Sequence, residues 1–214
     1  MRIGGFVKQS LIDWEGVLAA VIFTKWCNFR CGYCHNPSLV LPQLLNHRAD
    51  LEERAIWDYL TLRRHWLEGV VITGGEPTMQ PDLADFLSKL KSLGYRVKLD
   101  TNGTRPDLLE MFIARGWVDA VAMDIKHLPQ LVYYARVTPN ITPGGMERIH
   151  RSIALLRQSG IEYQFRTTLV PGVHTPTERQ ALERLFANDP YVVHPFRHPG
   201  GEGILADYLP VRHP

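Results

Sequence analysis

Short apolar runs alternate with longer amphipathic runs along this chain. The β-branched run at residues 17–24 is typical of a buried strand, and residues 51–67 carry apolar side chains at helical spacing. Further strand-like runs lie at residues 69–77, 95–103, 118–126, 161–172 and 190–196, and helical runs lie at about residues 81–94, 106–115, 146–159 and 177–187. The pattern predicts about six strands separated by helices.

Alternation of strands and helices favours an α/β fold with a parallel sheet and right-handed crossovers. About six such units suit either an open doubly wound sheet or an incomplete barrel, and the periodicity does not choose between them. A stretch holding Pro139, Pro143 and Gly144 interrupts the alternation and is expected to be irregular. The length of 214 residues fits a single domain over residues 1–214.

Glycine and polar residues cluster at or just beyond the carboxyl ends of the predicted strands. Both in open parallel sheets and in barrels, ligands bind at this edge. The residues concerned are Cys27, Gly74, Gly75, Glu76, Asp100, Asn102, Asp124, Lys126 and Arg166. The pattern therefore predicts a ligand site at this edge.

Composition narrows the class of protein. Apolar residues make up 45% of the chain and charged residues 21%, as in an ordinary folded globular protein. The formal net charge is +2 and the basic residues are scattered, so we expect no nucleic-acid partner. Because no apolar run reaches the roughly 18 residues of a membrane span and the first residues lack a signal-peptide pattern, we expect a cytoplasmic protein without membrane association.

All three cysteines lie within WCNFRCGYCHNP, residues 26–37, in the spacing C-x3-C-x2-C. An odd number in one tight cluster fits a reducing compartment. A disulfide would close only a very small loop and leave one thiol over. Structural zinc prefers four ligands in separated pairs, and His35 is poorly placed to be the fourth. The remaining interpretation is an iron–sulfur cluster on three thiolates, with one iron open to a substrate.

The order of the motifs resembles the radical S-adenosylmethionine (SAM) superfamily. In this chain Tyr33 precedes the third cysteine, the cysteine motif follows the first predicted strand, and GGEP follows the second. Together with LIDWEG, KLDTNGT, AMDIK and FRTTLVPG, these motifs resemble the activating enzymes of glycyl radical enzymes, most of all those of anaerobic ribonucleoside-triphosphate reductases. Pyruvate formate-lyase activating enzymes are somewhat less similar. The resemblance runs from Ile3 to about Arg197.

This resemblance implies a fold, cofactors and a reaction. The implied fold is an incomplete parallel (β/α)6 barrel, in which Cys27, Cys31 and Cys34 hold one 4Fe–4S cluster. SAM would chelate the open iron through its amino and carboxylate groups. One electron from a flavodoxin or ferredoxin-type donor would split SAM into methionine and a 5′-deoxyadenosyl radical. That radical would take a Cα hydrogen from a glycine of the anaerobic reductase.

The resemblance also implies residues that bind SAM. The loop of Gly74, Gly75 and Glu76 would hold the methionyl amino group, and Tyr33 with His35 would lie beside the adenine. The other implied contacts are Asp100, Asn102, Asp124, Lys126 and Arg166, with Arg197 and His198 as candidates near the end of the chain. The two aspartates could hold a monovalent cation. Asp13 matches a position that contacts the glycine-bearing loop of the partner.

Three alternatives stay open. A 7-carboxy-7-deazaguanine synthase shares the cysteine and GGEP motifs but acts on a small pterin. An activating enzyme for another glycyl radical enzyme is the second, although those with a ferredoxin-like insert need additional cysteines. The third is a metal-binding adaptor without catalysis. Trp26 departs from the family pattern, because a small residue usually precedes the first cysteine. How the cysteine loop packs around this indole is not predicted by the resemblance.

Overall fold

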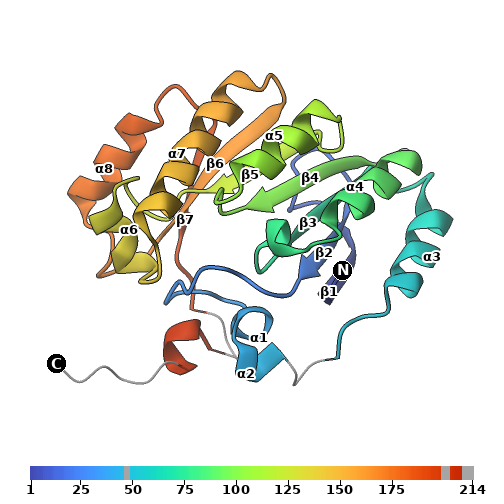
Figure 1. Cartoon of the computed structure of the whole chain (residues 1–214), viewed down its shortest axis with the longest axis horizontal. Coiled ribbons are helices and arrows are strands. Elements are labelled where there is room, and N and C mark those ends of the chain that lie inside the picture. The colour runs from blue at the N-terminus through green and yellow to red at the C-terminus, as the bar shows by residue number, and fades with distance from the viewer. Residues whose placement is uncertain (46–48, 199–202, 209–214) are drawn as a thin grey trace.

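A single curved sheet organises the part of the chain that the computed structural model describes, residues 1–45, 49–198 and 203–208. Its seven strands lie in the sheet in the order in which they occur in the chain. They are β1 (Ile3–Ser10), β2 (Ala19–Thr24), β3 (Gly69–Gly74), β4 (Arg96–Thr101), β5 (Ala120–Asp124), β6 (Glu162–Leu169) and β7 (Tyr191–Pro195). Strands β2 to β7 are parallel, and β1 pairs antiparallel with β2. The predicted incomplete (β/α)6 barrel is thus confirmed (Figure 1).

Helices follow the parallel strands and pack mainly along one side of the sheet. They are α3 (Glu53–Arg63), α4 (Leu83–Ser92), α5 (Pro106–Ala114), α6 (Leu131–Val137), α7 (Pro143–Gln158) and α8 (Pro176–Leu185). Figure 1 shows two short helices, α1 (Pro37–Val40) and α2 (Pro42–Leu45), set apart from this row. None of the helices in the described ranges is long and apolar enough to cross a membrane.

The main core lies between the sheet and its helices. Ile22, Ile72 and Leu99 point from successive strands into this core, where they join Leu87 of α4 and Ile149 of α7. All five side chains are fully buried. Since side chains of a strand alternate between faces, the neighbouring residues of the same strands point to the other, inner face of the sheet.

The inner face is apolar at one end and polar at the other. Near the amino ends of the strands, Trp14 covers Val21, Val71 and Ala120 in a small second core. Its indole N–H donates to Glu162 Oε1 at 3.0 Å, which ties the loop before β2 to β6. Toward the carboxyl ends, polar side chains take over the same face, so this end is free to form a site.

Strand β1 was not expected from the sequence. Gly4 and Gly5 weaken the strand pattern there, because glycine gives a strand no side chain to pack. A Cβ on Gly4 would lie 2.3 Å from Leu39 Cδ2, so glycine lets β1 approach α1 closely.

The stretch expected to be irregular contains more helix than predicted. Helix α6 lies entirely within the interval left between the predicted strand at 118–126 and helix at 146–159. Helix α7 begins at Pro143, because Pro143 takes its first turn and Thr142 Oγ1 accepts a hydrogen bond from the Gly145 N–H. The prediction was therefore wrong for Pro143 and Gly144 and right for Pro139, which lies between the two helices.

Candidate active site

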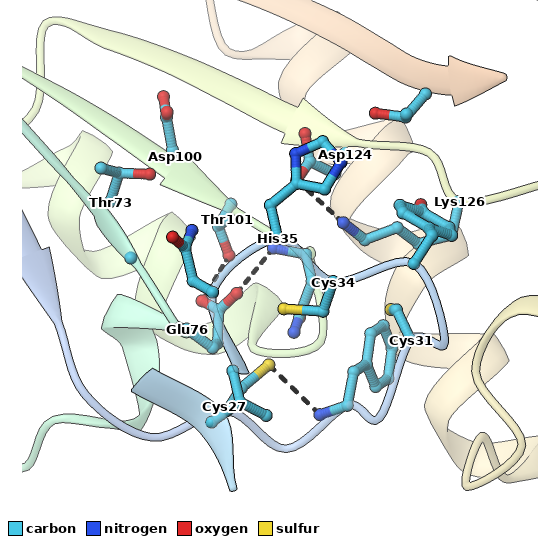
Figure 2. Close-up of a pocket in the computed structure, with 18 residues that line it drawn as sticks. Cys27, Cys31, Cys34, His35, Thr73, Glu76, Asp100, Thr101, Asp124 and Lys126 are labelled. Atoms are coloured by element: carbon cyan, nitrogen blue, oxygen red, sulfur yellow. Dashed lines mark hydrogen bonds and ion pairs between the residues drawn. The ribbon is translucent and has the colours of Figure 1, made fainter. Parts of the chain in front are cut away.

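The loop after β2 brings three thiols to the wall of one pocket. Cys27, Cys31 and Cys34 all line this pocket, and none of the three forms a disulfide. Figure 2 shows them on one loop, facing the side chains that β3, β4 and β5 contribute from their carboxyl ends. Most of the predicted site residues line the same pocket, namely Tyr33, His35, Gly74, Gly75, Glu76, Asp100, Asn102, Asp124 and Lys126.

Hydrogen bonds from outside hold the cysteine loop in shape. Asn102 Nδ2 donates to Asn28 Oδ1 at 2.8 Å, and Asn28 Nδ2 donates to Thr104 Oγ1 at 2.8 Å. From the α6–α7 segment, Asn140 donates to the Asn28 carbonyl and accepts from the Arg30 N–H. The loop is therefore tied to two other segments of the barrel.

The other side of the loop is closed by a segment from near the end of the chain. The Leu205 N–H donates to the Cys34 carbonyl at 3.1 Å, and the Ala206 N–H donates to the Gly32 carbonyl at 2.9 Å. The Leu205 side chain is fully buried against the apolar residues Leu39, Val40 and Leu41. This segment, which continues into the short 3-10 helix Leu205–Tyr208, covers the cysteine loop.

Trp26 fits before the first cysteine because its indole points outward. Its backbone has φ of 75°, in the left-handed region, and its side chain remains 40% exposed. The Trp26 carbonyl accepts from the Glu76 N–H at 2.7 Å. A Cβ on Gly75 would lie only 2.0 Å from this carbonyl oxygen, so the close contact between the two loops requires glycine at position 75.

Glu76 is a buried carboxylate with most of its acceptor capacity in use. Its Oε1 accepts from the Thr78 N–H, the Thr78 hydroxyl and the Thr101 hydroxyl, at 3.2, 2.6 and 2.7 Å. Its Oε2 accepts only from the Asn102 N–H, at 2.7 Å, among the described residues. Burial raises the pKa of Glu76 although these donors act in the opposite direction. The second lone pair of Oε2 is available for a donor in the pocket.

Alternating charges cross the ends of β4, β5 and β6. Lys126 Nζ donates to Asp124 Oδ2 at 2.9 Å, and Arg166 Nε donates to Asp124 Oδ1 at 3.0 Å. Arg166 Nη1 also donates to Asp100 Oδ2 at 3.2 Å. Asp100 Oδ1 is buried without a hydrogen-bond partner in the described part of the chain, and Lys98 Nζ lies 4.0 Å from it.

Burial and these neighbours shift the pKa values in opposite ways. Burial disfavours the charged form of Asp124, but Lys126 and Arg166 outweigh it and lower the pKa of Asp124 to about 2. Burial likewise disfavours the Lys126 ammonium, whose pKa Asp124 nevertheless raises well above the usual value. For Asp100, burial prevails over Arg166 and Lys98, and its pKa is raised.

Four predicted residues lie outside the pocket wall. Arg166 stands behind it and reaches the site through the two aspartates. Arg197 and His198 are exposed and do not line the pocket, although the neighbouring Phe196 ring lies 5.2 Å from that of His35. Asp13 is also outside this pocket, and its carboxylate accepts from the Ser10 hydroxyl at 2.5 Å.

The pocket also has lining residues that the sequence interpretation did not select. They are Phe29, Asn36, Val40, Thr73 and Thr168. The period of two along a strand could have indicated Thr168, because it lies two residues after Arg166 on the same face of β6. Phe29, Asn36 and Val40 belong to the cysteine loop and α1, where no such period applies.

The donor set in this pocket suits an iron–sulfur cluster. Thiolates are the ligands that such clusters use, and three are available here. Within the described ranges, no three His, Cys, Asp or Glu side chains are grouped to hold a single metal ion. Burial raises the pKa of the three thiols, that of Cys31 to about 11, and coordination to a metal removes their protons.

Comparison with known proteins places the chain in a family. The model of the radical SAM superfamily matches residues 21–185. A putative glycyl-radical enzyme activating enzyme of Methanocaldococcus jannaschii is 32% identical over 176 residues, which cover 80% of this chain and 69% of the relative. The pyruvate formate-lyase-activating enzyme of Clostridium pasteurianum is 27% identical over 191 residues, covering 87% and 75% of the two chains.

The fold has counterparts among solved structures. The crystal structure of Streptococcus suis SuiB bound to S-adenosylmethionine has a TM-score of 0.63 and 15% identity, covering 87% of this chain and 43% of SuiB. At that identity the likeness concerns the fold alone. The family match, the relatives and the three-thiol pocket agree, and the chain belongs to the radical SAM superfamily, among its glycyl-radical enzyme activating enzymes.

Proposed function

We propose that this enzyme generates a glycyl radical on an anaerobic ribonucleoside-triphosphate reductase. The observation that carries the proposal is a single pocket that gathers three free thiols, the Gly74–Glu76 loop and the Asp124–Lys126 ion pair. The choice of the reductase as partner rests on the motifs LIDWEG, AMDIK and FRTTLVPG, and pyruvate formate-lyase is the alternative partner.

In this proposal Cys27, Cys31 and Cys34 hold one 4Fe–4S cluster with an open iron. When bound, the cluster supplies the electron that splits SAM into methionine and a 5′-deoxyadenosyl radical, which removes a hydrogen atom from a glycine Cα of the partner. A flavodoxin or ferredoxin-type protein is the proposed source of that electron. The protein's own task is to bind and orient SAM and to exclude water.

Glu76 is the proposed partner of the methionyl ammonium group. Its Oε2 has an acceptor site left after the bond from Asn102. The bonds from Thr78 and Thr101 to Oε1 fix the direction of the carboxylate, so it is oriented before SAM binds. Gly74 and Gly75 beside it let the backbone lie close to the ligand.

Lys126 is the proposed partner of the methionyl carboxylate, as a point charge held beside Asp124. Arg166 maintains the orientation of Asp124 and Asp100 from behind. We also propose that Asp100, with one buried oxygen lacking a hydrogen-bond partner in the described residues, and Asp124 hold a monovalent cation near the sulfonium.

The nucleoside half of SAM would lie against Tyr33 and His35, with Asn102 also lining the pocket. Contact between His35 and Phe196 brings the next two residues, Arg197 and His198, near this end of the pocket. They remain candidates for polar contacts to the nucleoside. Asp13 remains the candidate for contact with the glycine-bearing loop of the partner.

The test is anaerobic reconstitution with iron and sulfide, followed by reduction and incubation with SAM and a candidate partner. Electron paramagnetic resonance should detect a glycyl radical on the anaerobic reductase. A radical on pyruvate formate-lyase alone would overturn the choice of partner but support the reaction. SAM cleavage with turnover of a small pterin would favour the deazaguanine synthase alternative. Absence of an iron–sulfur spectrum would contradict the proposal as a whole.

A further inference from the structure

The backbone of Lys126 is held by side chains from two other segments. Strand pairing ends one residue earlier, where the Ile125 N–H donates to the Arg166 carbonyl at 2.7 Å. Beyond it, the Lys126 N–H donates to the Tyr134 hydroxyl at 3.1 Å. The Lys126 carbonyl lies 3.0 Å from His174 Nε2. The backbone N–H and carbonyl of Lys126 therefore both find their hydrogen-bond partners in side chains and not in the sheet.

Tyr134 approaches Lys126 from α6. Its side chain is fully buried, so the hydroxyl has little water to replace a lost partner. Burial raises the pKa of Tyr134, so it is a neutral phenol at physiological pH. Its oxygen is the acceptor for the Lys126 N–H.

His174 approaches from the loop between β6 and α8, and its contacts define its tautomer. Its Nδ1 accepts a hydrogen bond from the Val170 N–H at 3.0 Å. Nδ1 therefore carries no proton, and the ring is the neutral form with its hydrogen on Nε2. That Nε2–H is the donor to the Lys126 carbonyl.

The orientation of the His174 ring is also restrained by stacking. The His127 ring lies against it, with centroids 4.5 Å apart and planes at 22°. His127 also stacks on Tyr133 of α6, with ring centroids 5.2 Å apart. The stack connects α6 to the loop that carries His174, the two segments that hold Lys126.

We propose that Tyr134 and His174 are positioning residues that fix the Lys126 backbone from opposite ends and thereby hold its ammonium beside Asp124. The inference rests on the proposed role of Lys126 in SAM binding. Neither residue lines the pocket, so both act on the ligand only through Lys126.

A matched pair of variants at position 174 separates the two hydrogen bonds of the ring. In His174→Gln, the side-chain amide reaches about as far as Nε2 and can still donate to Lys126. In His174→Asn, the shorter amide oxygen can accept from Val170 but does not reach Lys126. Positioning predicts weaker SAM binding by roughly fivefold in the Asn variant and near-normal binding in the Gln variant, the effect of one hydrogen bond. Equilibrium dialysis of the reconstituted protein measures this affinity.

A role confined to anchoring the loop predicts the reverse order, because only the Asn variant keeps the Val170 bond. Equal affinities in the two variants, or weaker binding by the Gln variant, would overturn the proposal for His174. The 15N shifts of the imidazole provide a second readout in the wild type. A dominant Nδ1–H tautomer would also overturn it.

Tyr134→Phe tests the other end of the Lys126 backbone without changing the ring. Hydrogen exchange at the Lys126 amide of the cluster-free protein should become faster, by roughly fivefold for a bond of this kind, while core amides such as those of β3 stay unchanged. An unchanged Lys126 amide would overturn the proposal for Tyr134. This measurement does not involve SAM.

Lys126→Met distinguishes failure of the inference from failure of the proposed function. Unchanged SAM affinity in this variant would remove Lys126 from SAM binding and with it the functional consequence of the two hydrogen bonds. If its affinity drops but Tyr134→Phe and His174→Asn bind SAM like the wild type, Lys126 acts without these two residues and the positioning inference is wrong.

Discussion

Lys126 and Asp124 form an ion pair of 2.9 Å between Nζ and Oδ2, although a single residue separates them in the chain. The other carboxylate oxygen of Asp124 is held by Arg166 at 3.0 Å. With a cation on each oxygen, the carboxylate has one favoured orientation. Arg166 also pairs with Asp100 at 3.2 Å, so two carboxylates face these two cations, and the structure places a positive side chain at the pocket wall with its charge balanced.

Replacing Asp124 by Asn should lower the free energy of unfolding and make that free energy depend less on pH in the acid range. The substitution leaves two cations without their shared partner, at a cost of about 1–2 kcal/mol, because the Asp124 side chain is 34% exposed and solvent screens part of the interaction. In the wild type, unfolded Asp124 has a pKa of 3.8 and the folded form one of about 2. The unfolded state binds more protons between these values, so stability falls as pH drops from about 4 to about 2.

Denaturant titrations between pH 2 and pH 5 measure this difference. The variant should lack the Asp124 part of the decline. Asp58→Asn is the matched control, because its carboxylate is 75% exposed and lies 3.9 Å from Arg54. A control that changes the pH profile as much as Asp124→Asn would contradict the interpretation.

Serine at position 27, 31 or 34 should abolish the iron–sulfur absorbance and SAM cleavage while leaving the fold intact. The three thiols form no disulfide, and serine is close to cysteine in size. Absorption spectroscopy after reconstitution and circular dichroism measure the two properties separately. Retained SAM cleavage in any one variant would remove that cysteine from the ligand set.

Gly75→Ala should disrupt the site, whereas Gly32→Ala should be tolerated. At position 75 a Cβ would lie 2.0 Å from the Trp26 carbonyl oxygen, a backbone atom that cannot move without displacing the cysteine loop. At position 32 the nearest heavy atom is 3.9 Å away, on Ala206. The midpoint of thermal denaturation and the affinity for SAM should both fall in Gly75→Ala and stay near the wild-type values in Gly32→Ala. Equal behaviour would mean that the two loops can separate.

Stability should also fall between about pH 6.5 and pH 4 because of His127. Burial and the neighbouring His174 lower its pKa from 6.5 to about 4. Over this range the unfolded state binds a proton that the folded state excludes, so stability rises with pH. His127→Phe keeps an aromatic ring in the stack and should reduce the slope. A slope equal to that of the wild type would show that His127 titrates normally in the folded protein.

Much of the site could be predicted because parallel strands deliver their ends to one edge. Gly74, Asp100 and Asp124 are far apart in the sequence but lie at the carboxyl ends of neighbouring strands, so an alternating pattern was enough to bring them together. A buried cation in a strand requires a partner, so a neighbouring aspartate was one candidate for Arg166, and the strand register places Asp124 opposite it.

Contacts made by loops could not be predicted in the same way. The outward direction of the Trp26 indole depends on a left-handed backbone that the sequence does not indicate for tryptophan. The hydrogen bond from Lys126 to Tyr134 depends on a short helix in a stretch with several helix breakers. Strand β1 was missed for a related reason, because Gly4 and Gly5 have low strand propensity and Gly4 is needed there for close approach to Leu39.

The contacts of Leu205 have a consequence for the order of events during synthesis. Nearly the whole barrel lies between Cys34 and Leu205 in the chain, yet the two residues are joined by a backbone hydrogen bond. The ribosome therefore releases the cysteine loop long before the segment that covers it. Until that segment is made, the apolar side chains of Leu39, Val40 and Leu41 lack the contact with Leu205 that buries them in the folded protein.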